Sequence, residues 1–344
     1  MSSAKRNSLY EAAVFAAGSL PASWTRTGQD RMLGQLAGSH GRYRIGLSTV
    51  AGRLFHVKVS ALDAVPAEAV ERINLVCMDA NWQMPTACFS YSPAGDGSVM
   101  AQAAIALDRC VEVPDERLYR NLLGQCVLNS ELLWLVVEAV NKGTSVEDAR
   151  AFRSELFRAL FLGELGGLPT WLRPEGPPPA APEQLIDACA AAATAAGWEQ
   201  ARRAPDQLIM VCAGSPATGP VHTDVDVHEQ SLIVSSHPFG PGLLVPEERR
   251  PAVAVLLNRI LESGVPFGLA LDLQSGDLVA RSYLDLAGVP AIPSPELLCD
   301  VIFQSAAGAF LYLEPLVAVA HEGADPDEAL AQQVARQLEG RQAG

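Results

Sequence analysis

Basic residues are scarce in this chain of 344 residues. It has 25 lysines and arginines against 39 aspartates and glutamates, which gives a net charge of −14. Such a negative field repels phosphate backbones and anionic lipid headgroups. We therefore expect neither nucleic acid nor a membrane surface among the partners of this protein.

Long apolar runs and paired cysteines are also missing. The longest uncharged run in the C-terminal half, residues 301–313, is shorter than the roughly 20 apolar residues of a membrane span. Residues 12–20 are apolar and follow Lys5 and Arg6, but Glu11 interrupts this resemblance to a signal peptide. The seven cysteines include no Cys-x-x-Cys pair, which is typical of a reducing compartment. We expect a cytoplasmic protein without a signal peptide.

Catalytic signatures are absent too. The sequence has no Gly-x-Ser-x-Gly, no His-Glu-x-x-His, no Walker-type loop and no dinucleotide fingerprint. Its glycine-rich segments, at 38–41, 95–97 and 240–242, lack the lysine or the helix of a phosphate cradle and are interpreted as turns. The sequence therefore predicts a protein that is not an enzyme, with no cofactor and no metal.

What the sequence does contain is an internal repeat. Residues 97–107 (Gly-Ser-Val-Met-Ala-Gln-Ala-Ala-Ile-Ala-Leu) align without a gap with residues 276–286 (Gly-Asp-Leu-Val-Ala-Arg-Ser-Tyr-Leu-Asp-Leu), at an offset of 179, and Pro114 and Pro293 keep that offset. In both segments every second residue is mostly apolar, which predicts a half-buried strand. A duplicated fold follows, and the hydrophobic content of 49% is enough for two buried cores.

The residues before each strand repeat as well. Helical segments at 66–81 and 246–263 have apolar residues three and four positions apart. Short strands at 86–91 and 268–273 follow, and the second is joined to the next strand by a two-residue loop at 274–275. Each copy therefore contains a helix followed by a β-hairpin.

Helices follow each hairpin. Asp115 and Ser294 are equivalent N-caps, and Pro315 should break the second of the long helices. Both copies then show glycine, three residues, an acidic pair and alanine, at 143–149 and 323–329. We interpret Glu147-Asp148 and Asp327-Glu328 as residues that favour the first turn of a last helix rather than as acid–base catalysts.

The front of each copy and the boundaries complete this organisation. We expect helices at 30–38 and 182–198, and a proline-rich linker at residues 164–182. Residues 1–28 have no apparent counterpart and are an N-terminal arm or an extra helix. The first domain then covers residues 29–163 and the second covers residues 183–344. Strands are expected at 43–49 and 54–60 in the first copy, and at 207–213, 221–227 and 231–236 in the second.

The order of elements, together with the hairpin-to-helix segment and the Gly-x-x-x-acidic-acidic-Ala end, resembles the YbjN family and the bacterial type III secretion chaperones of the Tir-chaperone type. The resemblance implies an α+β domain whose antiparallel sheet is backed by helices, with no chemistry of its own. Such domains pair, and a pair of secretion chaperones holds an extended stretch of a client protein. Two tandem copies imply a pseudo-twofold arrangement, either as a monomeric pseudo-dimer or within a homodimer.

The resemblance suggests a protein or peptide client as the partner, held by strands that face away from the backing helices. Which residues face that way depends on the register, because a shift of one residue exchanges the two faces of a strand. The expected partner-binding residues are Met100, Gln102 and Ala104 in the first copy and Val279, Arg281 and Tyr283 in the second.

The best candidate for metal chemistry is His222-Thr-Asp224-Val-Asp226-Val-His228. On a strand these four polar residues share one face, but the two histidines are about 20 Å apart and cannot bind one ion. We expect a solvated strand face there.

A formal cysteine–histidine pair is the other candidate for chemistry. Cys88 or Cys110 would act with His40 or His56, but neither cysteine has a neighbouring cation or a helix N-terminus to lower its pKa. We expect both to be core cysteines, and we expect Trp171, in the linker, to dock one copy onto the other.

A protein-binding chaperone or adaptor is therefore the first hypothesis. Two alternatives remain open: a small-ligand or metal-dependent enzyme on the same scaffold, and a structural subunit of a larger complex.

Overall fold

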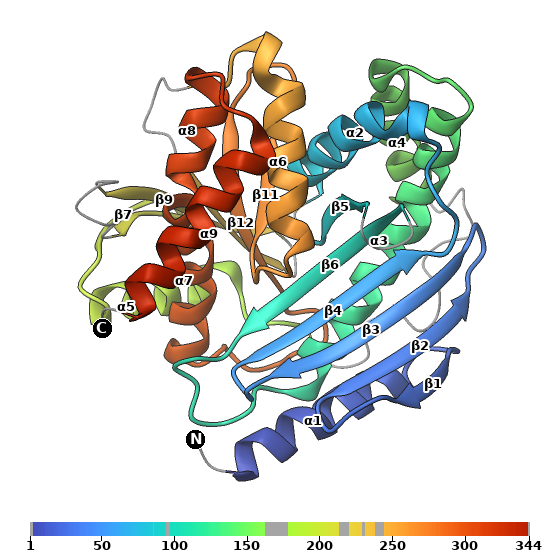
Figure 1. The fold of residues 1–344 in the computed structure, drawn as a ribbon. Coiled ribbons are helices and arrows are strands. Elements are labelled where there is room, and N and C mark those ends of the chain that lie inside the picture. Colours follow the sequence, from blue (N-terminus) through green and yellow to red (C-terminus); the bar gives the residue numbers. More distant parts are fainter. Residues whose placement is uncertain are drawn as a thin grey trace.

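The fold consists of two antiparallel sheets of six strands, each backed by helices (Figure 1). The computed structural model describes residues 3–84, 86–93, 97–161, 178–212, 220–228, 231–237 and 244–342. This is the expected α+β class with two tandem copies. The expected linker at 164–182 lies mostly outside the described residues.

The first sheet has the strand order β1-β2-β3-β4-β6-β5, and every neighbouring pair is antiparallel. Its strands are β1 (Ser23–Arg26), β2 (Arg31–Ala37), β3 (Arg42–Val50), β4 (Leu54–Ala61), β5 (Cys88–Ser92) and β6 (Ser98–Ala106). The helices of this copy are α1 (Ser3–Gly18), α2 (Val70–Gln83), α3 (Glu116–Asn141) and α4 (Val146–Phe161), and the 3-10 turn η1 (Ala67–Ala69) leads into α2.

The second sheet repeats this order as β7-β8-β9-β10-β12-β11. Its strands are β7 (Glu199–Ala204), β8 (Gln207–Cys212), β9 (Val221–His228), β10 (Ser231–His237), β11 (Gly268–Leu271) and β12 (Leu278–Asp285). The helices are α5 (Pro182–Ala195), α6 (Arg250–Glu262), α7 (Pro295–Leu311), α8 (Leu313–His321) and α9 (Pro326–Gln342), and η3 (Glu247–Arg249) leads into α6.

The helices that back each sheet within its own copy lie on one face of it. In the first copy α3 and α1 pack behind the sheet, and in the second α7 and α5 do so. The strands bury every second residue against these helices, as in β2 and β3, where Met32, Leu36, Ile45 and Leu47 are buried. In Figure 1 the opposite face of the first sheet is turned toward the viewer. Helix α6 of the second copy packs on β5 and contacts Gln102 of β6 on that face, whereas no described helix lies there on β2 or β3.

The repeat starts earlier than the sequence predicted. Residues 1–28 were expected to have no counterpart, but α1 and β1 stand in the same order as α5 and β7 of the second copy. Leu9 and Ala16 of α1 are fully buried, and α1 packs against α3 and β3. The N-terminal segment is therefore part of the first copy, and its described residues include the expected helix.

The expected helix at residues 30–38 is wrong, because β2 occupies this segment. Met32, Gly34 and Leu36 alternate with exposed residues and face the helices. A period of two over seven residues is the pattern of a half-buried strand. The helix expected at 182–198 and the five strands expected at the front of the two copies are present as α5, β3, β4, β8, β9 and β10.

The second hairpin has a longer loop than the predicted residues 274–275. The strand β11 ends at Leu271, and residues 272–277 form the turn, in which Asp272 accepts a hydrogen bond from the Gln274 N–H at 2.9 Å. Gly276 in this turn has a φ of +81°, and a Cβ there would lie 2.3 Å from the carbonyl oxygen of Val245. Only glycine fits at this position.

The predicted break at Pro315 is confirmed. The long helix of the second copy ends at Leu311, α8 begins at Leu313, and the two helices are bent by 42°. Its counterpart α3 continues for 26 residues and is long and apolar enough to cross a membrane by length and composition alone. Because 67% of its most apolar window is buried inside the protein, α3 is the core helix of the first copy.

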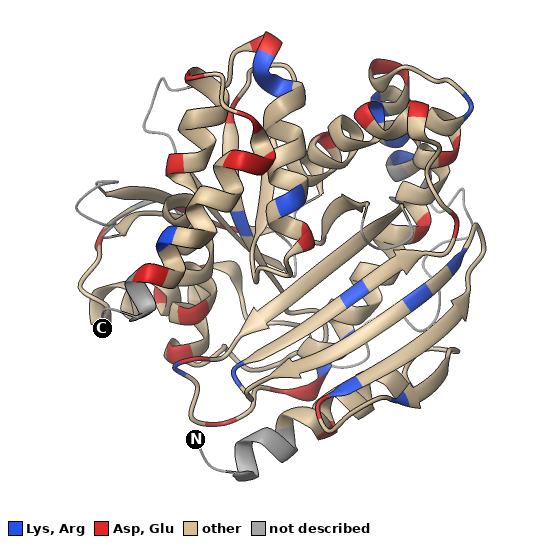
Figure 2. Cartoon of the chain, in the orientation of Figure 1, with Lys and Arg blue, Asp and Glu red and all other residues tan. Residues whose placement is uncertain are grey.

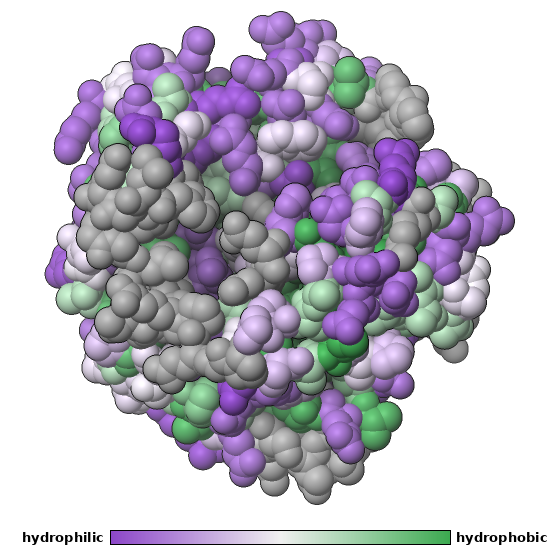
Figure 3. Space-filling model, turned by 180° about the vertical axis from the view of Figure 1, so that it is seen from behind, coloured by the Kyte–Doolittle hydropathy of each residue, from purple (hydrophilic) through white to green (hydrophobic). Residues whose placement is uncertain are grey.

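The surface seen from behind carries hydrophobic residues in small patches separated by hydrophilic ones (Figure 3). Most large apolar side chains of the described residues are buried inside the two copies or between them. Among the exposed apolar side chains, Val111 and Ile292 line one hollow between the loops that precede α3 and α7.

The two copies hold their last helix by ion pairs of opposite polarity. In the first copy Asp79 on α2 binds Arg153 on α4, with Oδ2 and Nη2 at 2.7 Å and both side chains 2% exposed. In the second copy the equivalent of Asp79 is Arg259 on α6, which binds Asp327 on α9 at 3.1 Å, and Asp327 is 67% exposed. The same helix contact is thus made by a buried pair in one copy and an exposed pair in the other.

Replacing Asp79 by alanine should destabilise the fold by about 3–5 kcal/mol, because Arg153 would be left buried without a countercharge. Arg259→Ala is the matched control in the other copy and should cost about 1 kcal/mol or less. Chemical denaturation of both variants measures the difference. Equal losses of unfolding free energy would contradict this interpretation.

Candidate functional site

The six residues predicted to bind a partner lie between the two copies. The facing was predicted correctly, since these side chains point away from the helices of their own copy. That face, however, is covered by the other copy, so the side chains are not available to an external partner. Met100 and Val279 are 1% exposed, Gln102 2% and Tyr283 9%, while Ala104 and Arg281 are half-buried.

Gln102 and Arg281, which are equivalent in the repeat, make equivalent contacts across this interface. Gln102 Nε2 donates to the carbonyl oxygen of Leu261, near the end of α6, at 2.6 Å. Arg281 Nη1 donates to the carbonyl oxygen of Asn81, near the end of α2, at 3.2 Å and to that of Trp82. The Arg281 guanidinium also lies 5.1 Å from the centre of the Trp82 ring. Trp82 therefore contributes to the docking of the copies. Trp171, which the sequence analysis expects to dock them, lies outside the described residues.

The long helices make a second equivalent pair of contacts. Asn121 on α3 donates from Nδ2 to the carbonyl oxygen of Ala287 at 2.8 Å. Asp300, which follows Asn121 by 179 positions on α7, accepts from the backbone N–H of Arg109 at 2.8 Å and from its guanidinium at 2.8 Å. Each helix thus holds the loop that follows the last strand of the other copy.

A third pair shows the same symmetry. Gln125 on α3 donates to Asp285 at 3.3 Å, and Gln304 on α7 accepts from the N–H of Ala106 at 3.2 Å. Three sets of equivalent contacts establish a pseudo-twofold relation between the copies. This is the self-complementary contact of a twofold dimer, made within one chain.

Asn81 links the two sheets at their edges. Its Nδ2 donates to the carbonyl oxygens of Phe89 on β5, at 2.9 Å, and of Leu269 on β11, at 3.1 Å. Its Oδ1 accepts from the N–H of Phe89 at 2.6 Å. Phe89 and Leu269 are equivalent residues of the repeat. One buried amide therefore supplies hydrogen-bond partners to equivalent backbone carbonyl groups on both edge strands.

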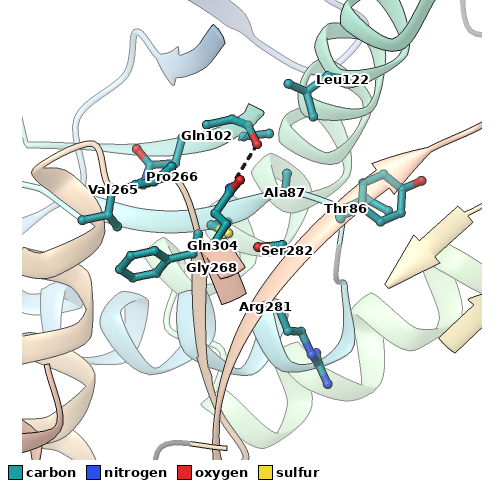
Figure 4. Close-up of a pocket in the computed structure, with 15 residues that line it drawn as sticks. Thr86, Ala87, Gln102, Leu122, Val265, Pro266, Gly268, Arg281, Ser282 and Gln304 are labelled. Carbon is teal, nitrogen blue, oxygen red and sulfur yellow. Dashed lines mark hydrogen bonds between the residues drawn. The ribbon is translucent and has the colours of Figure 1, made fainter. Parts of the chain in front are cut away.

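A small cavity remains in the interface, lined by residues of both copies (Figure 4). Its volume of about 30 Å³ is enough for a water molecule and too small for a substrate. Gly268 and Cys88 lie on opposite sides of the interface, and a Cβ at Gly268 would stand 2.4 Å from the Cys88 sulfur. The close approach of β5 and β11 therefore depends on this glycine.

The cysteine–histidine pair is not activated. Burial raises the pKa of the Cys88 thiol to about 12, and burial, with Lys58 nearby, lowers the pKa of His56 to about 4. Cys110 lies 3.8 Å from the carboxylate of Asp300, a neighbour that disfavours a thiolate. Cys110 is a core residue, as predicted, whereas Cys88 is half-buried at the interface and has the cation Arg281 nearby.

The strand from His222 to His228 is confirmed as half-buried. Its valines and Thr223 point into the core, and the two histidines, Asp224 and Asp226 lie on the outer face. The structure adds His237 of β10, which pairs with His222 across the strands and has Nε2 3.5 Å from Asp224. Among the described residues no group of three histidines, cysteines or carboxylates is arranged to hold a metal ion.

The acidic pairs of the last helices have structural contacts. Asp148 accepts a hydrogen bond from the Ser145 hydroxyl at 2.7 Å in the first turn of α4. In α9 the cap is Asp325, which accepts from the N–H groups of Asp327 and Glu328. Asp327 and Glu328 lie in the first turn of α9, as predicted, and Asp325 is the cap that precedes them.

The surface that remains for a partner is the outer face of each sheet. We use the name open face for the side chains of the first sheet that point away from α3 and α1. In its centre Gly46 contributes no side chain, and Leu33, beside it, is 37% exposed. The open face consists of Arg31, Leu33, Gln35, Arg42, Arg44, Gly46, Ser48, Val50, Leu54, His56, Lys58 and Ser60.

Comparison with known proteins adds little to this geometry. No family model and no curated protein matches the chain. Among solved structures, the di-domain ARO/CYC BexL from the BE-7585A biosynthetic pathway is similar at 9% identity, with a TM-score of 0.15, over 92% of this chain and 95% of that one. Such a score carries no argument about the fold or the function.

The close approach of Gly268 and Cys88 can be tested with a double mutant. Gly268→Ala should cost about 1–3 kcal/mol, because the added methyl group overlaps the Cys88 sulfur. Cys88→Ala in the same chain should restore most of this loss, whereas Cys88→Ala alone should not stabilise the protein. Denaturant unfolding of the single and double variants measures the coupling, and strictly additive losses would refute the contact.

The low pKa of His56 predicts how the free energy of unfolding depends on pH. Its folded-state pKa of about 4 lies below the unfolded value of about 6.5, so protonation favours the unfolded chain. Stability should be fully present above pH ~6.5 and fall by up to about 3 kcal/mol as the pH is lowered toward ~4. His56→Gln should flatten this part of the pH profile of unfolding free energy, and the exposed His228→Gln should leave it unchanged. A His56→Gln profile parallel to the wild type would contradict the prediction.

Proposed function

We propose that this protein is a non-enzymatic protein-binding module, of chaperone or adaptor type, that holds an extended segment of a partner protein. One observation carries the proposal. Each copy packs helices on one face of a six-stranded antiparallel sheet and leaves the other face of β2 and β3, or of β8 and β9, without a described helix. An extended chain can lie across such a face or pair with an edge strand.

The interface between the copies supports this function indirectly. The face of β6 and β12 is already used to join the copies, so the chain is a pseudo-dimer that does not need a second copy to cover it. In our proposal the protein acts in the cytoplasm as a tandem relative of the YbjN-like and secretion-chaperone-like domains. The partner then meets the strands farther from the pseudo-twofold axis, and β1 and β7 are the free edges.

Gly46 offers a direct test of this surface. A Cβ at Gly46 would have only Leu33 and the Lys58 carbonyl as neighbours, at 3.8 and 3.9 Å, so a tyrosine fits without an internal clash. Wild-type protein should bind a subset of 15-residue unstructured peptides on an array of varied sequence. Gly46→Tyr should weaken that binding about tenfold or more, because the ring obstructs the centre of the open face.

Gly18→Tyr is the matched control. Gly18 ends α1 and has open space around it, so this variant should bind peptides as the wild type does. Thermal unfolding of both variants verifies that they are folded. Absence of peptide binding by the wild-type chain, or equal binding by Gly46→Tyr, would reject the proposed function.

A further inference from the structure

The strands that carry the open face hold only positive charge. Across the 24 residues of β2, β3 and β4 there are four cationic side chains and no aspartate or glutamate, although the whole chain has 39 acidic and 25 basic residues. All four cations lie on the open face, at Arg31, Arg42, Arg44 and Lys58. Figure 2 shows basic residues along these strands, and acidic residues on the surrounding helices and loops.

The equivalent face of the second sheet has the opposite character. Its strands β8, β9 and β10 contain no lysine or arginine and carry Asp224 and Asp226. The paired strands place Asp224 where the first copy has Gly46, and His222 where it has Arg44. The positive charge therefore belongs to one copy and does not follow from the fold.

Acidic side chains approach two of the four cations from the rim. Arg42 Nη2 is 3.8 Å from Oδ1 of Asp63, which follows β4. Burial lowers the pKa of Lys58, and the nearby carboxylate of Glu262 on α6 acts on that pKa in the opposite direction. Arg31 and Arg44 are exposed on the strands themselves. Because charges farther apart than about 8 Å are screened at physiological ionic strength, a ligand on this face meets the local cations rather than the net charge of −14.

The spacing of these cations fits an extended polypeptide. Arg42 and Arg44 are two residues apart on β3, about 6.6–7 Å along the strand. Carboxylates on every second residue of an extended segment repeat at the same distance. Two carboxylates of such a segment can therefore meet two arginines without distortion of either chain.

We infer that the open face of the first copy selects an acidic extended polypeptide segment, with glutamate or aspartate on alternate residues. The inference rests on the proposed function and specifies the partner chemistry of that surface. Arg31 and Arg44, near opposite ends of the paired strands β2 and β3, supply charge-assisted hydrogen bonds, and Arg42 and Lys58 extend the positive surface.

The test uses four labelled probes with the full-length protein. They are a 16-residue peptide of alternating glutamate and serine, its lysine–serine and threonine–serine counterparts, and a 16-nucleotide oligo-dT. Fluorescence anisotropy should show binding of the glutamate–serine peptide that weakens as salt is raised. Arg31→Glu/Arg44→Glu should weaken it at least about tenfold, and Arg44→Lys should retain most of it.

Lys142→Glu/Arg158→Glu is the matched control, because it makes the same change in net charge on α3 and α4. This control should bind the glutamate–serine peptide as the wild type does, and circular dichroism verifies that both double variants are folded. Equal weakening by the two double variants would overturn the inference, since net charge alone would then explain the binding.

The other probes separate the remaining outcomes. Stronger binding of the lysine–serine peptide, or equal binding of oligo-dT, overturns the inference in favour of a basic segment or a nucleic acid. Binding of the threonine–serine peptide as strong as that of the acidic one overturns the charge selection but leaves the proposed function standing. If no peptide binds, the inference fails, and failure of the array as well rejects the proposed function.

Discussion

The interface between the two copies is the constraint on which the rest of the structure depends. The sheet of each copy ends in a hairpin whose outer face is apolar or bears polar groups that need partners, as at Met100 and Gln102. The other copy supplies those partners, and Asn81 alone satisfies carbonyl groups on both edge strands. Because buried polar groups are costly when they are unpaired, neither copy is complete without the other.

This constraint explains which residues are free to diverge. At the interface the equivalent positions keep equivalent contacts although their chemistry changes, as with Asn121 and Asp300, or Gln102 and Arg281. Away from it the copies differ in charge: Asp79 corresponds to Arg259, and the second sheet has His222 where the first has Arg44 and Asp224 where it has Gly46. One copy can therefore acquire a separate surface chemistry while the pseudo-dimer remains intact.

Much of the fold could be predicted from the sequence because the repeat supports each assignment twice. The strands β6 and β12, the caps Asp115 and Ser294, and the break near Pro315 follow from local signals and are present in the structure. The expected half-burial of β6 and β12 is wrong, because the other copy covers their second face. The segment at 30–38 was assigned wrongly because its charged and apolar residues also fit a short helix. The counterpart of residues 1–28 was missed because α1 and α5 share small apolar residues rather than a motif.

The sequence by itself determined the two α+β copies and the hairpin in each. The alternation of side chains along a strand limited the facing of β6 and β12 to two possibilities, and the structure shows which of them is real. Only the tertiary structure decided what covers that face. Contacts such as Arg281 with Trp82, or Gly268 with Cys88, join residues almost 200 positions apart, and no local pattern encodes such a pairing. For this reason the candidate binding surface is the open face of β2, β3 and β4, and not the face of β6 and β12 at the pseudo-twofold axis.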